Sequence, residues 1–204
     1  MKIIGIVGSS RKNGNTDILV KKVLEGAKQS GAEVEVLYLS DYNIIDCLGC
    51  EGCAKTNKCV IKDDMHIIYE KLDESDGLVL GSPTYFYNVS GRVKVFMDRL
   101  YQYEVFDDND RSVWSSVNEL NGIKYAVTVA ICEQESIEDM GVTSLVMEKT
   151  LNAVGWRSVA NLKAIHLFKK GEADNYSKTL EEAENSGIKL VKTIKLKEKI
   201  QKGN

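Results

Sequence analysis

Four cysteines crowd into one short segment and are the residues of this chain best suited to binding a metal. They are Cys47, Cys50, Cys53 and Cys59, which lie within thirteen residues. The spacing brings three sulfurs onto one face of a tight loop, and the longer gap returns the fourth from the other side. The pattern favours a [4Fe-4S] cluster. A zinc site, which more often uses two separated C-x2-C pairs, and free or redox-active thiols remain alternatives.

A polar loop near the N-terminus, residues 8–16 (GSSRKNGNT), carries a second signal. Its small residues let backbone N–H groups converge, Arg11 offers a guanidinium fork, and the start of the following helix adds partial positive charge. The loop lacks both the Lys-Ser/Thr ending of a triphosphate loop and the glycine spacing of a dinucleotide site. We therefore predict a monophosphate site. The alternative is an ordinary polar loop with a helix cap at Asn15 or Thr16.

A second loop, residues 81–89 (GSPTYFYNV), follows a short apolar run. Pro83 is the only proline of the chain, and it fixes the turn as the backbone leaves the sheet. Three consecutive aromatic side chains then offer flat apolar surface beside backbone N–H groups, which suits a planar heterocycle. An aromatic loop packed under its own helix would also account for this segment taken alone.

Strands and helices alternate along the chain and would place both loops at one edge of a sheet. Apolar runs predict strands at residues 2–7, 33–39, 77–81, 124–131 and 157–168. Helical spacing predicts helices at residues 17–27, 64–72, 89–101 and 141–154, and a helix or a pair of helices broken near 186–187 within 173–202. The alternation predicts an α/β fold with a parallel sheet covered on both faces. A single domain, residues 1–204, accommodates it, with insertions at 40–62 and 102–122.

Charge and apolar run length exclude two classes of protein. Lys and Arg number 27 against 30 Asp and Glu, a net charge of -3, so no overall basic field favours nucleic-acid binding. The longest apolar stretches run about six to eight residues, whereas a bilayer-spanning helix needs roughly 20. We therefore expect a soluble, unexported, cytoplasmic protein with no nucleic-acid or membrane partner.

The remaining candidate residues receive structural roles. His66 and His166 are the only histidines, and neither sits in a nucleophile or metal constellation. Cys132, far from the other thiols, is expected to be a small buried apolar side chain.

Two charged pairs are also read as structural. Asp63 and Asp64 precede a predicted helix, so capping of that helix is a sufficient explanation for both. Asp98 and Arg99 are expected to make ion pairs on the surface or between packed helices.

The motifs taken together resemble a known family. GSSRKNGNT at 8–16, DDM at 63–65, GSPTYFYNVSGRVKVFMDR at 81–99 and the cysteine run are similar to the flavodoxin-like NAD(P)H-dependent FMN reductases, and more closely to the iron-sulfur flavoproteins. The similarity covers roughly residues 1–101 and is only architectural beyond them. It implies a flavodoxin-like, doubly wound, five-stranded parallel sheet of order 2-1-3-4-5, with the cysteine-rich insertion after the second strand.

The resemblance also implies cofactors and the residues that bind them. The FMN phosphate would contact Ser9, Ser10, Arg11, Asn13, Asn15 and Thr16. The isoalloxazine ring would lie along Pro83, Thr84, Tyr85 and Phe86. The four clustered cysteines would hold the [4Fe-4S] cluster. Nothing is carried over to residues 132–135 after the fourth strand, because they lack the glycines often found there.

The function implied is an FMN-dependent electron-transfer flavoprotein that relays electrons between a reduced donor and a one-electron carrier. Its partners would be NAD(P)H or a ferredoxin-like protein, and a homodimer or homotetramer would bring one subunit's cluster near another's flavin. One alternative is a cluster-free NAD(P)H-dependent FMN or quinone reductase. A second is a zinc- or thiol-based redox-sensing module on an emptied flavodoxin scaffold.

Overall fold

A computed structural model describes residues 1–203, and its centre is a sheet of five parallel strands. The strands are β1 (Lys2–Val7), β2 (Glu33–Tyr38), β3 (Gly77–Tyr85), β7 (Lys124–Ile131) and β8 (Trp156–Ala164). Their order is β2-β1-β3-β7-β8, with all four pairings parallel. The predicted order of 2-1-3-4-5 is therefore confirmed. The three inner strands are almost wholly buried because helices cover both faces, which explains their uninterrupted apolar runs.

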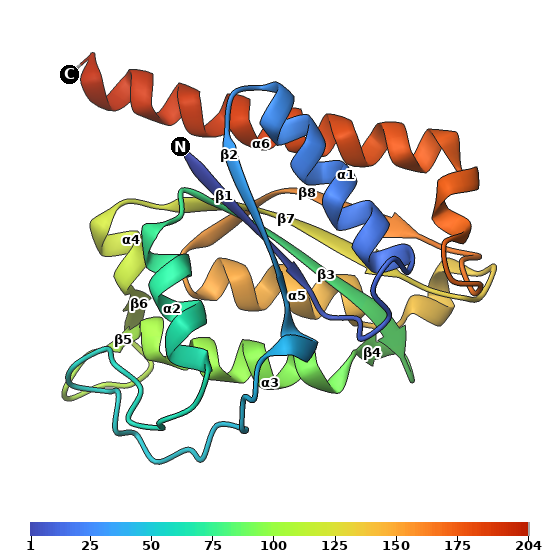
Figure 1. Ribbon diagram of the computed structural model, residues 1–204. Coiled ribbons are helices and arrows are strands. Elements are labelled where there is room, and N and C mark those ends of the chain that lie inside the picture. The colour runs from blue at the N-terminus through green and yellow to red at the C-terminus, as the bar shows by residue number, and fades with distance from the viewer. Residues whose placement is uncertain (204) are drawn as a thin grey trace.

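Helices form a layer on each face of the sheet (Figure 1). One face is covered by α1 (Asn15–Gln29) and α6 (Ser177–Lys202), whose apolar side chains pack on Ile3, Val79 and Val127. The other face is covered by α2 (Met65–Glu74), α3 (Gly91–Arg99) and α5 (Thr143–Ala153), which pack on Ile4, Leu78 and Ala126. Each helix presents one apolar stripe, so burial of that stripe fixes which face it covers.

The last helix, α6, is continuous, so the break considered near residues 186–187 is wrong. Gly187 instead marks the place where α6 crosses α1, and a Cβ atom built on it would lie 1.8 Å from the backbone oxygen of Val23. Gly26 of α1 fills the same role, because its Cβ would lie 2.0 Å from the oxygen of Glu184. The two glycines let the helix backbones touch. In the sequence, a glycine within a helix indicates only a low helix propensity.

Strand β3 runs four residues beyond its predicted end at Gly81 and takes in Pro83. The backbone oxygen of Gly81 accepts a hydrogen bond from the N–H of Gly8, so Gly81 faces β1. Pro83, two residues on, faces the same way, where β1 has already ended. The missing N–H of proline therefore costs no ladder bond, and the opposite edge still pairs with β7 up to Ile131. A two-residue strand, β4 (Asn88–Val89), folds back on the end of β3.

Two insertions depart from the repeating pattern. After the short 3-10 turn Leu39–Asp41, residues 42–62 run as an irregular loop at the periphery, visible at the lower left of Figure 1. Residues 104–121 form a hairpin of β5 (Glu104–Phe106) and β6 (Trp114–Ser116), followed by the short helix α4 (Val117–Asn121). None of the helices in residues 1–203 has both the length and the apolar character of a membrane span.

Candidate functional site

A cavity opens at the carboxyl ends of β1, β3 and β7, and the two loops singled out in the sequence meet there. The first loop contributes Ser9, Arg11, Gly14, Asn15 and Thr16, the second contributes Pro83, Thr84 and Tyr85, and later segments contribute Ile131, Glu133, Leu167, Phe168 and Lys170. Ligands in open α/β sheets bind at this edge. The structure thus brings seven of the ten predicted flavin-site residues into one lining. Ser10, Asn13 and Phe86 lie outside it.

The first loop needs a glycine where the chain leaves β1. A Cβ atom on Gly8 would lie 2.0 Å from Cγ2 of Val93 and 2.8 Å from the oxygen of Gly81. The hydroxyl of Ser90, which caps α3, donates to the backbone oxygen of Gly8 at 2.9 Å. This close packing against β3 and α3 sets the direction in which the loop enters the cavity.

The start of α1 faces the cavity with free donors. The backbone N–H groups of Asn15 and Thr16 have no hydrogen-bond acceptor among residues 1–203, as expected for a first helical turn. Buried Asp17 accepts a hydrogen bond from the backbone N–H of Asn13 at 2.6 Å and another from the hydroxyl of Tyr38 at 3.0 Å. Asn13, in a left-handed conformation with φ of 57°, therefore shapes the loop through its backbone.

Asn15 was expected to contact phosphate, but its side chain is engaged elsewhere. Its amide donates to the backbone oxygens of Leu167 and Lys169 at 3.2 and 3.0 Å, and its oxygen accepts from the N–H of Ala173 at 3.1 Å. These bonds fasten the loop after β8 against the start of α1. The predicted strand 157–168 ends at Ala164, and the released segment carries exposed Phe168 and Lys170 to the cavity.

A wider hollow adjoins this cavity under the aromatic segment. It has a volume of about 550 Å³ against about 80 Å³ for the first cavity, and both linings share Thr84, Tyr85 and Glu133. Its other lining residues are Phe86, Tyr87, Cys132, Gln134 and Asp139. The hydroxyl of Thr84 is buried at the junction and has no hydrogen-bond partner among the described residues.

The aromatic segment is exposed rather than packed under α3. Phe86 is 99% exposed and Tyr87 61% exposed, and both have positive φ, at 47° and 64°. Backbone of this kind in bulky residues stores strain and is frequent at ligand sites. The alternative of an aromatic loop buried against its own helix is therefore wrong, and Cys132, 2% exposed, is buried as expected.

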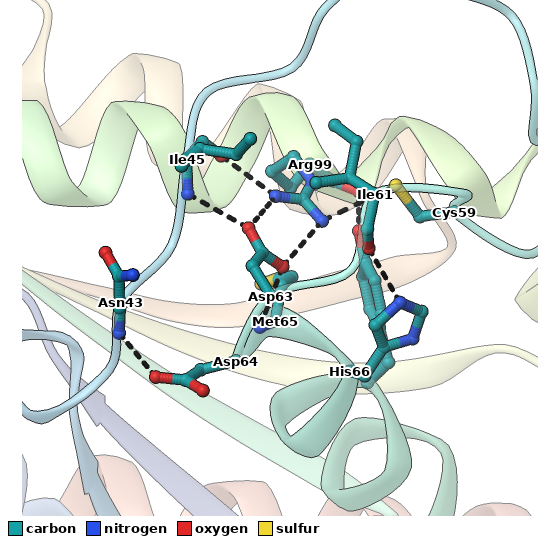
Figure 2. Close-up of polar contacts among 10 residues, drawn as sticks. Asn43, Ile45, Cys59, Ile61, Asp63, Asp64, Met65, His66 and Arg99 are labelled. Atoms are coloured by element: carbon teal, nitrogen blue, oxygen red, sulfur yellow. Dashed lines mark hydrogen bonds and ion pairs between the residues drawn. The ribbon is translucent and has the colours of Figure 1, made fainter.

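The cysteine loop is fastened to the body of the protein by a buried ion pair (Figure 2). The guanidinium of Arg99, at the end of α3, donates to both carboxylate oxygens of Asp63, at 2.6 and 3.0 Å. It also donates to the backbone oxygen of Ile45 at 2.8 Å and approaches the sulfur of Cys59 at 3.4 Å. Arg99 is 1% exposed, so the ion pair expected of it is present but lies in the interior. Asp98 makes the expected surface pair, with Lys94.

Asp63 caps α2 as expected, whereas the expectation that Asp64 also caps this helix is wrong. Asp63 accepts from the N–H of Met65 at 3.1 Å, as a cap would, but also from the N–H of Ile45 at 2.9 Å. Asp64 accepts from the N–H of Asn43 at 2.7 Å and makes no capping bond to the helix. Burial would raise the pKa of Asp63, but the hydrogen bonds from Arg99 and the two N–H groups outweigh it, so its pKa is lowered. Both carboxylates hold the start of the cysteine loop.

The far end of the cysteine loop is anchored on the segment after α3. The backbone N–H of Cys59 donates to the side-chain oxygen of Gln102 at 2.9 Å. The amide of Asn57 donates to the backbone oxygens of Gln102 and Glu104 at 3.0 and 3.1 Å. His66 contacts the backbone oxygen of Ile61 at 2.7 Å through its ring, consistent with the structural role expected of it.

The four clustered thiols are free and lie within electrostatic reach of one another. Burial raises the pKa of the Cys53 thiol, its own backbone hydrogen bond lowers it, and the charges of Cys59, Cys47 and Cys50 raise it further. Within residues 1–203, no three His, Cys, Asp or Glu side chains converge on one ion position. In a [4Fe-4S] cluster each thiolate binds a different iron, so the four sulfurs need not converge on one ion position. Four cysteines therefore suit a cluster as ligands.

Comparison with known proteins agrees with this geometry. The protein-family model for NADPH-dependent FMN reductases matches residues 1–116. The chain belongs to this family. The match includes both cavity loops and all four clustered cysteines, which confirms the resemblance read from the motifs.

Curated relatives of this NADPH-dependent FMN reductase family member include iron-sulfur flavoproteins. One from Methanocaldococcus jannaschii is 46% identical over 99 residues, which is 48% of this chain and 51% of that protein. One from Archaeoglobus fulgidus is 44% identical over 99 residues, 48% of this chain and 48% of its own length. One from Clostridioides difficile is 38% identical over 104 residues, 50% of this chain and 46% of its own. The matched region thus spans about half the length of these curated relatives.

Solved structures share the flavodoxin-like architecture of the family. An NAD(P)H:quinone oxidoreductase from Methanothermobacter marburgensis superimposes with a TM-score of 0.72 at 15% identity, covering 93% of this chain and 98% of that one. A flavodoxin from the domain Archaea superimposes with a TM-score of 0.60 at 16% identity, covering 96% and 99%. At these identities the likeness concerns the fold alone.

Proposed function

We propose that the protein is an FMN-dependent oxidoreductase that transfers electrons and carries a [4Fe-4S] cluster on its cysteine loop. The observation that carries the proposal is the joined pair of cavities at the carboxyl edge of the sheet. The narrow one is bordered by the unpaired N–H groups of Asn15 and Thr16, and the wide one by the aromatic segment. The narrow cavity suits the small anionic end of a ligand, and the wide cavity suits a large planar ring of the same ligand.

The phosphate would lie against the start of α1. The two free N–H groups and the partial positive charge of the helix end would bind it, with the guanidinium of Arg11 closing one side. Lys170, on the loop that Asn15 holds in place, offers a second positive charge at the same cavity. Asn15 itself then acts by positioning that loop.

The isoalloxazine ring would lie in the wider hollow. Tyr85 presents a flat ring where the two cavities join, beside Pro83 of the narrow cavity. The unpartnered hydroxyl of Thr84, also at the junction, would hydrogen-bond a polar atom of the ring. Phe86 and Tyr87 lie farther out at the rim, where their rings would exclude water from the flavin.

The cysteine loop would bind the cluster through Cys47, Cys50, Cys53 and Cys59. Support comes from four free thiols on one anchored loop and from the curated iron-sulfur flavoproteins that this chain resembles. Bound FMN exchanges one or two electrons and a cluster exchanges one, so together they convert between hydride donors and one-electron carriers. The chain's part is to bind, orient and shield both groups.

The partners follow from that conversion. NAD(P)H is the proposed hydride donor, in keeping with the family description, and a ferredoxin-like protein the proposed one-electron partner. We further propose that the protein works in the cytoplasm as a homodimer or homotetramer that brings one subunit's cluster near another's flavin.

A second candidate is a cluster-free NAD(P)H-dependent FMN or quinone reductase. It is favoured by a relative in Bacillus subtilis described as a putative NAD(P)H-dependent FMN-containing oxidoreductase, 32% identical over 105 residues. Such an enzyme would oxidise NAD(P)H rapidly without iron. The zinc- or thiol-based sensing module has no comparable support.

Iron, acid-labile sulfide and flavin content of one anaerobic preparation would test the proposal. We expect one FMN and about four iron and four sulfide per chain. Bound FMN with near-zero sulfide would favour the cluster-free reductase. Zinc without flavin, and no affinity for added FMN, would contradict both and favour the sensing module. Rates of reduction by NADPH and by reduced ferredoxin would then identify the donor.

A further inference from the structure

Cys59 differs from the other clustered cysteines in its surroundings. Within residues 1–203 it is the clustered cysteine whose sulfur accepts a hydrogen bond from a buried cation, Nη2 of Arg99 at 3.4 Å (Figure 2). This distance suits an N–H···S contact, which is longer than an N–H···O bond because sulfur is larger. Cys59 also packs against the apolar core, and among the other three thiols Cys50 is exposed while Cys47 and Cys53 are partly buried.

The position of the guanidinium is fixed by its other contacts. Asp63, whose side chain is 5% exposed, accepts from both terminal nitrogens of Arg99, and Ile45 accepts from one of them. The hydroxyl of Tyr69 donates to the backbone oxygen of Arg99 at 2.6 Å. A planar fork held at this many points cannot turn away from the sulfur, which distinguishes it from a surface side chain in passing contact.

The sulfur is fixed from its own side as well. Gln102 accepts from the backbone N–H of Cys59, and Asn57 is tied to the same segment by two hydrogen bonds. Donor and acceptor therefore come from two rigidly placed pieces of backbone. Asp63 neutralises the charge of the buried guanidinium. The effect of Arg99 on the sulfur is therefore that of an oriented N–H dipole.

We infer that Arg99 is a positioning residue that tunes the redox potential of the cluster through Cys59, and this inference rests on the proposed function. One-electron reduction, with reduced flavin as the electron donor, adds one negative charge that is shared between cluster and thiolates. A fixed N–H donor at one thiolate stabilises that added charge, so it raises the reduction potential of the cluster. Arg99 lines neither of the two cavities at the carboxyl edge of the sheet, so a flavin bound there would not touch it.

The test compares midpoint potentials of cluster and flavin in anaerobically prepared protein, by dithionite titration with EPR and visible detection. The double variant Arg99→Gln/Asp63→Asn removes the ion pair without leaving a buried charge alone. Its cluster potential is expected to shift to a more negative value, with iron, sulfide and FMN content and the flavin potential unchanged. Arg99→Lys, which keeps the charge but cannot reach both Asp63 and the sulfur, should shift it the same way.

Lys94→Gln is the matched control, since it removes a cation of the same helix that pairs with exposed Asp98, and should leave both potentials unchanged. An unshifted cluster potential in a fully loaded Arg99 variant would overturn the inference. So would loss of iron with FMN retained, because Arg99 would then merely hold the loop. Wild-type protein without iron and sulfide would instead overturn the proposed function itself.

Discussion

The side chain of Asn15 joins the start of α1 to the backbone N–H of Ala173, 158 residues away in the sequence, at 3.1 Å. Two further bonds, to Leu167 and Lys169, complete the link. It holds Phe168 and Lys170 at the wall of the narrow cavity. From the sequence, Asn15 is predicted to be a phosphate ligand or a helix cap. In the structure its side chain instead links the start of α1 to the loop after β8.

Asn15→Ala is expected to lower stability and FMN affinity together. Three hydrogen bonds in a buried setting are lost and the partner groups are left unsatisfied, which costs about 2 to 4 kcal/mol of the free energy of unfolding. Urea unfolding of the flavin-free protein and fluorescence titration with FMN would measure the two effects. Asn185→Ala, an exposed position on α6, should change neither quantity. Full stability in Asn15→Ala would show that the clamp contributes nothing.

Arg11→Ala should affect FMN binding alone. Arg11 is exposed, and the one hydrogen bond of its side chain within residues 1–203, to the backbone oxygen of Phe168, is long at 3.5 Å, so the flavin-free fold does not depend on that side chain. Loss of a charged hydrogen bond to phosphate weakens FMN binding by roughly 1.5 to 3 kcal/mol. Lys12→Ala is the matched control, because Lys12 pairs with Asp41 and lies outside the cavity lining. Equal losses of FMN affinity in the two variants would mean that affinity depends on the net positive charge of the loop and not on a specific contact of Arg11.

Cys53→Ala should release iron and keep FMN. No residue of the cysteine loop lines either of the two joined cavities proposed to bind FMN, so the two groups are expected to bind independently. Cys132→Ala is the informative control: it removes a buried thiol beside the wider hollow, should cost about 1 kcal/mol of stability, and should retain iron. Iron, sulfide and flavin assays distinguish the two variants. Loss of both groups from Cys53→Ala would contradict independence.

Substitution of a glycine by alanine should change stability differently at the crossing of α1 and α6 and at an open helix position. Gly187→Ala places a methyl group into the backbone of Val23 and should destabilise by about 1 to 3 kcal/mol, measured by urea unfolding. Gly91→Ala, at the start of α3, has no atom within 4 Å of the new methyl group and should be neutral or stabilising by up to about 1 kcal/mol. Equal stabilities would indicate that α6 can slide away from α1.

Sequence patterns predicted the parts of this fold that depend on local burial. The runs at 2–7 and 124–131 match β1 and β7 residue for residue, because strands covered on both faces are apolar throughout. The apolar pattern does not predict the end of β3, because a proline is tolerated at position 83 only where the neighbouring strand β1 has already ended. The sequence around Gly187 allows a helix break, because the contact that requires a glycine there is with the backbone of another helix, α1. Both errors concern contacts between segments distant in the sequence.

The residues of the candidate site also differ in whether local sequence patterns can predict them. Loops that follow predicted strands could be assigned to the cavity, since the carboxyl ends of parallel strands share one edge. Phe168 could not, because the apolar pattern places it inside the predicted strand 157–168, and Lys170 follows that strand without a motif around it. The burial of Arg99 was equally hidden, since its partner Asp63 lies 36 residues earlier and only the fold brings them together.

Acid should weaken the attachment of the cysteine loop through Asp63. Its pKa in the folded protein is lowered from 3.8, so its contribution to stability is complete above the unfolded value and is lost as the pH falls through the folded value. In Arg99→Gln the hydrogen bonds from the guanidinium are gone and only the N–H groups of Ile45 and Met65 oppose the effect of burial, so the pKa of Asp63 should be higher than in the wild type. Urea unfolding between pH 7 and 3 should then show a smaller loss of stability on acidification than in the wild type. Asp98→Asn, on the surface of the same helix, should follow the wild-type curve, and an Arg99→Gln curve parallel to it would contradict the assignment.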